Sequence, residues 1–179
     1  MTRKEQIERV LNEKGIKELV KRDDFIYIAH LLEEECFNEF DDGRFGKIFE
    51  ITTGLYLKGY RGNITVSAKG KIDMTYKGKK FEVKSNCGSF LADIEKNDFM
   101  IYSYDNKADY TKPQNAHVIP MKEFLQGLED CGLFRKSKHT SAKGLTMAIQ
   151  SYANSKRKLA MWTGFIDKYP TLAEYKAGA

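Results

Sequence analysis

With 179 residues and 41% apolar composition, the chain is long enough to bury the core of one globular domain, whereas two domains would each have little core. Its 30 basic and 25 acidic side chains give a net charge of +5, which excludes neither nucleic-acid binding nor an ordinary Lys-rich surface. The chain lacks a run of about 20 apolar residues, and its polar N-terminus MTRKEQIERV does not resemble a signal peptide, so we expect a cytoplasmic protein without membrane contact.

The spacing of the cysteines and histidines excludes the familiar metal motifs. Three cysteines form no CxxC pair, and three histidines form no HExxH or HxxxH pair. Neither a disulfide framework nor a zinc site is indicated. A metal ion would therefore have to be bound by oxygen atoms.

The first 42 residues are predicted to form two helices. Thr2 and Glu5 suit a capping box, and the apolar residues that follow have i, i+3, i+4 spacing. Asp23 and Asp24 suit the start of a second helix that reaches Cys36. We interpret both helices as scaffold.

A short helix that begins near Gly43 and ends at Gly54 is predicted next, with Glu50 at the margin of its apolar stripe. Three alternating segments separated by Lys-Gly turns then predict an antiparallel meander over residues 64–68, 71–76 and 79–85. In the second half, a central strand is predicted at 98–104 and a further strand at 116–119. Four helices are also predicted, at 120–130, 141–154 and 159–169 and from the capping box 171–174 onward.

This order of elements predicts an α/β or α+β fold with a mixed central sheet flanked by helices. We expect a single domain over 1–179. It would consist of a helical N-terminal segment (1–42), a core (43–132) and a basic helical C-terminal segment (133–179).

The register of the predicted hairpin decides which side chains meet. If Lys77-Gly78 is a two-residue turn, Tyr76 pairs with Lys79 and Asp73 lies opposite Glu82. Opposed residues have Cβ atoms roughly 4.5 to 5.5 Å apart, close enough for two carboxylates to share a divalent ion. A longer loop would shift the register and remove this pairing.

Lys84 is expected on the same face as Glu82, one side-chain period further along the strand. Two interpretations are open. The hairpin can have an ordinary solvated face on which lysines compensate the carboxylates, or the carboxylates can bind Mg²⁺ for phosphodiester hydrolysis assisted by a lysine.

Glu50 on a helix, Asp73 on a strand and Glu82-Val83-Lys84 on the next strand resemble the PD-(D/E)XK nuclease superfamily over about residues 43–120. The resemblance implies a restriction-endonuclease-like core. It assigns metal binding to Asp73 and Glu82, catalysis to Lys84, and a direct or water-mediated metal contact to Glu50. The chain departs from the motif at Ile72, where the family name has Pro. The implied activity is that of an endonuclease or nickase that cuts DNA with Mg²⁺ or Mn²⁺.

A basic segment supplies a candidate DNA contact. No acidic residue occurs between Asp130 and Asp167. Cationic side chains gain affinity for nucleic acid by releasing condensed counterions. The candidate residues are Arg135, Lys136, Lys138, Lys143, Lys156, Arg157 and Lys158.

Two other functions are weighed against the nuclease. The short, Lys-rich, Tyr-rich chain is similar in style to small phage and mobile-element proteins, some of which are anti-CRISPR inhibitors. A nuclease-like fold could then bind a protein or ribonucleoprotein partner in the cytoplasm of a bacterial or phage-infected cell. A structural or assembly role is the third interpretation. The sequence leaves a homodimer open.

Overall fold

The computed structural model describes residues 5, 9, 12–13, 15–22, 24–36, 44–58, 74–85, 89–90, 96–104, 111–133, 147–148 and 156–178. The helices are α2 (Ile16–Lys21), α3 (Phe25–Cys36), α4 (Arg44–Lys58), the short 3-10 helix η3 (Pro113–Asn115), α5 (Met121–Asp130), α6 (Lys156–Ile166) and α7 (Leu172–Ala177). The strands are β1 (Met74–Tyr76), β2 (Lys79–Ser85), β3 (Ser89–Phe90), β4 (Phe99–Ser103), β5 (His117–Pro120) and β6 (Met147–Ala148).

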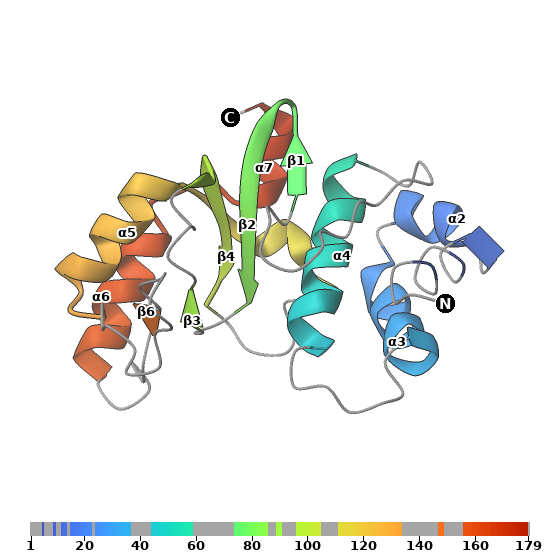
Figure 1. The fold of residues 1–179 in the computed structure, drawn as a ribbon, viewed down its shortest axis with the longest axis horizontal. Helices are drawn as coiled ribbons and strands as arrows, with labels where there is room; N and C mark the ends of the chain where they lie inside the picture. Colours follow the sequence, from blue (N-terminus) through green and yellow to red (C-terminus); the bar gives the residue numbers. More distant parts are fainter. Residues whose placement is uncertain are drawn as a thin grey trace.

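Four of these strands form one mixed sheet in the order β1-β2-β4-β5 (Figure 1). β1 and β2 are antiparallel, β2 and β4 are parallel, and β4 and β5 are antiparallel. The predicted mixed sheet flanked by helices is therefore confirmed. The central position predicted for the strand near 98–104 is also confirmed, because β4 lies between β2 and β5 and is buried from Met100 to Ser103.

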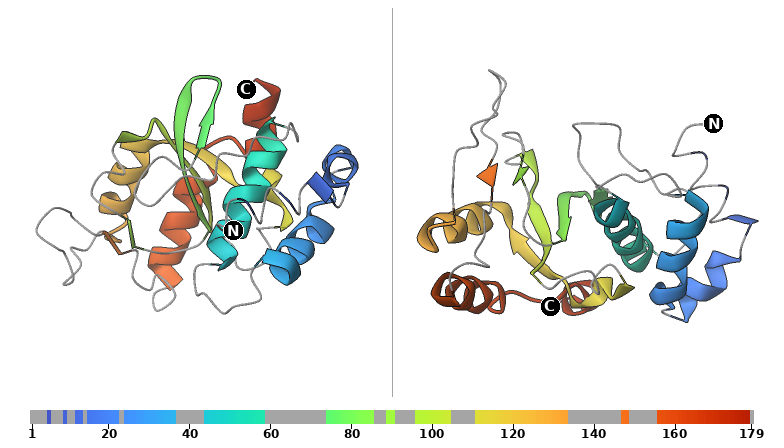
Figure 2. Two further views of the ribbon diagram at one scale, coloured as in Figure 1. Left: turned by 45° about the vertical axis from the view of Figure 1, so that its right-hand side comes forward. Right: turned by 90° about the horizontal axis from the view of Figure 1, so that it is seen from below.

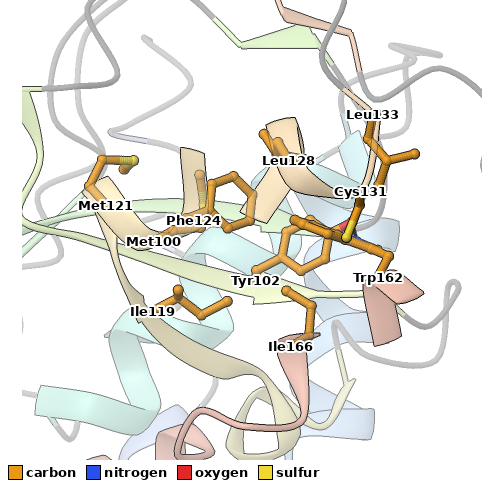
Figure 3. Packing of buried hydrophobic residues seen from close by; sticks show 10 residues of the cluster. All are labelled: Met100, Tyr102, Ile119, Met121, Phe124, Leu128, Cys131, Leu133, Trp162 and Ile166. Carbon is orange, nitrogen blue, oxygen red and sulfur yellow. Dashed lines mark hydrogen bonds between the residues drawn. The ribbon is translucent and has the colours of Figure 1, made fainter. Parts of the chain in front are cut away.

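Each face of the sheet has its own apolar core. Figure 3 shows the cluster between the sheet and helices α5 and α6, where the Trp162 indole N–H donates to the Tyr102 hydroxyl oxygen at 3.3 Å. The opposite face packs against α4 and α7 through Phe49, Phe81 and Leu172. Helices α2 and α3 cover the outer side of α4 in a third cluster, so α4 is buried between two layers (Figures 1 and 2).

Helix α4 corrects one predicted boundary. It continues four residues past Gly54, which was expected to end it. A Cβ atom at Gly54 would lie 3.5 Å from Met74 Cε, so the glycine lets the helix pack closely on β1. Because the following turn buries Leu55 and Leu57, the tertiary contacts favour continuing the helix.

The helix predicted over 141–154 is wrong at the two residues that the structure describes. Met147 and Ala148 form β6, which pairs with Phe90 and Ser89 of β3 in an antiparallel ladder. Pairing with a distant segment supplies backbone hydrogen bonds that a weak local helix preference cannot outweigh. The other residues of 141–154 lie outside the described part of the chain.

Several other predicted elements are confirmed within small shifts. Helices α3 and α5 and strand β2 have the predicted extents, whereas α6 begins and ends three residues before the predicted 159–169. Thr171 and Glu174 form the predicted capping box at the start of α7. The strand predicted at 64–68 lies outside the described residues. No helix in the described ranges is long and apolar enough to cross a membrane.

Candidate metal and phosphate site

The β1–β2 hairpin has the predicted register. Lys77 and Gly78 have φ angles of 47° and 75°, the two positive values that a type I′ turn requires. Tyr76 pairs with Lys79, as the two-residue turn predicts, and the ladder continues through two further pairs. A turn of this type matches the twist of the two strands, which explains why the weak Lys-Gly signal suffices.

The pairing that the metal hypothesis requires lies one step further along. The last described pair of the ladder joins Met74 to Phe81. Asp73 lies outside the described residues, so its position opposite Glu82 stays a prediction. The structure does confirm the alternation on β2, because Phe81 and Val83 are buried while Glu82 and Lys84 are partly exposed.

Glu82 and Lys84 meet on the face of the sheet that packs against α5 and α6. Parallel pairing places Glu82 beside Met100 and Lys84 beside Tyr102, whose side chains belong to that apolar cluster. The cluster draws its strand residues from β4 and β5, so β2 lies at its margin. The position explains why the side chains of Glu82 and Lys84 keep 16% and 32% exposure.

An ion pair joins these two side chains. Lys84 Nζ lies 2.9 Å from Glu82 Oε1, and the contact is partly shielded from water. Such a pair holds a carboxylate and an ammonium group at one place on a rigid strand, where a phosphate and a cation could both be bound.

Asn97 is part of this site and was missed by the sequence analysis. Its amide Nδ2 lies 3.5 Å from Glu82 Oε2, and the residue is only 8% exposed. The segment is fixed to β2 because the Lys80 amide donates to Asp98 Oδ2 and the Asp98 amide donates to the Lys80 carbonyl oxygen, both at 2.9 Å. No local pattern links residue 97 to the hairpin, since only the parallel pairing of β4 with β2 brings it there.

Glu50 lies on α4, the helix that packs against β2. It precedes Gly54 by about one turn, and Gly54 faces Met74 of β1, so Glu50 lies on the side of α4 toward the hairpin. Because α4 packs on the face of the sheet that carries Phe81 and Val83, Glu50 lies on the opposite face from Glu82 and Lys84. Its carboxylate forms an ion pair with Lys47, three residues earlier on the same helix. Lys47 is a second partner that the sequence analysis missed, although its i, i+3 spacing was a readable signal.

The donor set fits a hard cation in chemical type. Mg²⁺ and Mn²⁺ prefer carboxylate oxygens, which Glu82 supplies on the α5–α6 face of the sheet and Glu50 on the α4 face, both at partly buried positions. In the part of the chain that the structure describes, no three His, Cys, Asp or Glu side chains are grouped closely enough to hold a metal ion. A carboxylate opposite Glu82 would have to be supplied by Asp73, which lies outside that part.

The predicted DNA-binding residues are described only in part. Lys156 and Arg157 are exposed in the first turn of α6, and Lys158 Nζ donates to the Gly132 carbonyl oxygen at 3.0 Å. The N-terminus of α6 is the positive end of its helix dipole, and these three cations increase the positive charge there. The combination favours binding of an anion at this end of the helix. The other four predicted residues, Arg135, Lys136, Lys138 and Lys143, lie outside the described ranges.

No protein-family model, curated protein or solved structure matches this chain. The geometry around β2 and α4 therefore carries the functional argument.

Proposed function

We propose that the chain is a metal-dependent DNA endonuclease or nickase of the PD-(D/E)XK type. The observation that carries the proposal is the ion pair of Glu82 and Lys84, which is partly buried on one face of β2. The order of α4, the β1–β2 hairpin and strand β4, which pairs with β2 in parallel, supports a restriction-endonuclease-like core, because the resemblance implies a helix followed by strands in a mixed sheet. This core is part of the proposal.

Glu82 and Asp73 would hold Mg²⁺ or Mn²⁺ on the α5–α6 face of the hairpin. The direct or water-mediated metal contact of Glu50 would require its carboxylate to reach the ion from the opposite face of the sheet. The proposal requires the β1–β2 register to continue by one residue, so that Asp73 pairs with Glu82. A bound divalent ion supplies neutralising charge for a phosphodiester and a more acidic water. Asn97 and Lys84 donate to the two carboxylate oxygens of Glu82 and hold it in one orientation.

Lys84 contributes positive charge where the scissile phosphate would bind. In the structure its Nζ is held against Glu82 Oε1, so the ammonium needs little reorganisation to reach a phosphate at the same place. Its proton-bearing Nζ can donate a hydrogen bond to a phosphate oxygen and can orient the attacking water. Lys156 and Arg157 would bind the DNA backbone elsewhere, as exposed cations do.

The test is relaxation of a supercoiled plasmid in Mg²⁺ or in EDTA. We expect the parent to nick in Mg²⁺ only. Glu82→Gln, which removes the charge but keeps the shape, and Lys84→Ala should each slow nicking by about 100-fold or more. Glu129→Gln, at an exposed position on α5, is the matched control and should leave the rate unchanged.

Thermal unfolding followed by circular dichroism would show that the variants remain folded. If Glu82→Gln and Lys84→Ala nick at the parent's rate, the assignment of the site is wrong. If the parent does not nick in Mg²⁺ or Mn²⁺, the nuclease function itself is wrong.

One observation favours the second candidate, a nuclease-fold protein that binds and inhibits a nucleoprotein machine in the manner of anti-CRISPR proteins. Ile26 and Tyr27 are adjacent on the outer helix α3 and are 52% and 53% exposed. Aromatic side chains with adjoining apolar surface are enriched at protein interfaces. The same Glu82→Gln variant separates the two functions, because inhibition of a protein or ribonucleoprotein partner would survive it and nicking would not.

A further inference from the structure

Three lysines surround the turn of the β1–β2 hairpin. Lys77, Lys79 and Lys80 are all exposed, and Lys77 Nζ lies 5.4 Å from the centre of the Tyr76 ring. Within the described residues, none of these three ammonium groups takes part in an ion pair. Figure 1 shows the turn at the upper edge of the view, near α7, whose Tyr175 packs on Phe81 of β2.

The alternation of side chains along β2 places Lys79 and Lys80 on opposite faces of the strand. Lys80 shares its face with Glu82 and Lys84, whereas Lys79 lies on the opposite face with Phe81 and Val83. We infer that Lys80 binds a backbone phosphate of the nucleic acid that the Glu82–Lys84 site engages. This inference rests on the proposed function for the identity of the ligand.

The spacing fits a backbone that runs along the strand. Lys84 is four positions after Lys80, which corresponds to about 13 Å along the strand. A DNA backbone that follows β2 over this distance would therefore present different phosphates of one strand to Lys80 and to Lys84. Both side chains project from the same face, so a single strand can reach both.

The hairpin backbone is fixed before any ligand binds. Both backbone groups of Lys80 are hydrogen bonded to Asp98 at 2.9 Å, so only the lysine side chain has to be ordered on binding. Lys77 adopts a left-handed conformation that glycine or asparagine adopts at lower cost. The type I′ turn requires this conformation at its first central position, so the turn fixes the backbone of Lys77 as well.

The test compares Lys80→Ala with Lys79→Ala, a neighbour that differs only in its face of the strand. Binding of each variant to a fluorescein-labelled DNA duplex is measured by anisotropy in EDTA at several salt concentrations. We expect Lys80→Ala to weaken binding and to reduce the slope of log affinity against log salt by about 0.9, the value of one lost phosphate contact. Lys79→Ala should keep the parent's slope.

Equal slopes for the two variants, or no binding by the parent, would overturn the Lys80 contact. The nuclease function is judged separately, from nicking in Mg²⁺. Nicking that depends on Glu82, together with an unchanged slope for Lys80→Ala, would overturn the inference alone. Binding that depends on Lys80, without nicking by the parent, would overturn the nuclease function alone.

Discussion

Asn97 approaches Glu82 from a short segment before β4, and the two residues are brought together by the parallel pairing of β2 and β4. Sequence patterns predicted Glu82 and Lys84 on one face because alternation is a local property of a strand. They could not predict Asn97, because its place depends on which strand lies beside β2. Asp73 stays a prediction, one residue beyond the described ladder.

The Asn97 amide should matter for metal binding if it orients the Glu82 carboxylate. We expect Asn97→Ala to weaken Mn²⁺ binding and to slow Mg²⁺-dependent nicking by about 10- to 100-fold, the usual effect of losing a partner of a metal ligand. Asn115→Ala, at an exposed position in η3, is the control and should leave both unchanged. Calorimetry with Mn²⁺ measures the affinity, and an unchanged affinity for Asn97→Ala would contradict the role.

At the scale of elements, α5 and α6 cross at a point where only glycine fits. A Cβ atom at Gly127 would lie 2.3 to 2.7 Å from three carbon atoms of the Phe165 ring. That ring cannot easily move, because it stacks on Trp162 with centroids 5.5 Å apart. The apolar periodicity predicted α5 but not this crossing, which depends on the partner helix.

Gly127→Ala should therefore destabilise the protein by about 1 to 3 kcal/mol, as overpacking does, although alanine is the better helix former. Gly164 of α6 provides the matched control, because a Cβ there meets no atom within 4 Å. Gly164→Ala should stabilise the fold by up to about 1 kcal/mol. Urea unfolding measures both changes, and a stabilised Gly127→Ala variant would show that the crossing tolerates a wider separation.

At the scale of the whole molecule, the sheet separates two cores that share strands β4 and β5 but are covered by different helices. Trp162, the only tryptophan, lies in the core beneath α5 and α6. Leu172 of α7 lies in the core on the opposite face, and its amide donates to the Ala116 carbonyl oxygen at 2.6 Å. The sequence predicted a mixed sheet flanked by helices, but the division of helices between its faces follows from long-range pairing.

Because β4 and β5 contribute side chains to both cores, we expect the two to unfold together. Leu172→Ala should lower the free energy of unfolding by about 2 to 5 kcal/mol, since it leaves a cavity at a fully buried site. The loss should shift the urea midpoint of Trp162 fluorescence as much as that of far-ultraviolet circular dichroism, although Trp162 lies on the other face of the sheet.

Met161→Ala, at an exposed position on α6, should change stability by less than about 0.5 kcal/mol. A fluorescence midpoint that stays at the parent's value while the dichroism midpoint falls would mean that the two cores unfold independently.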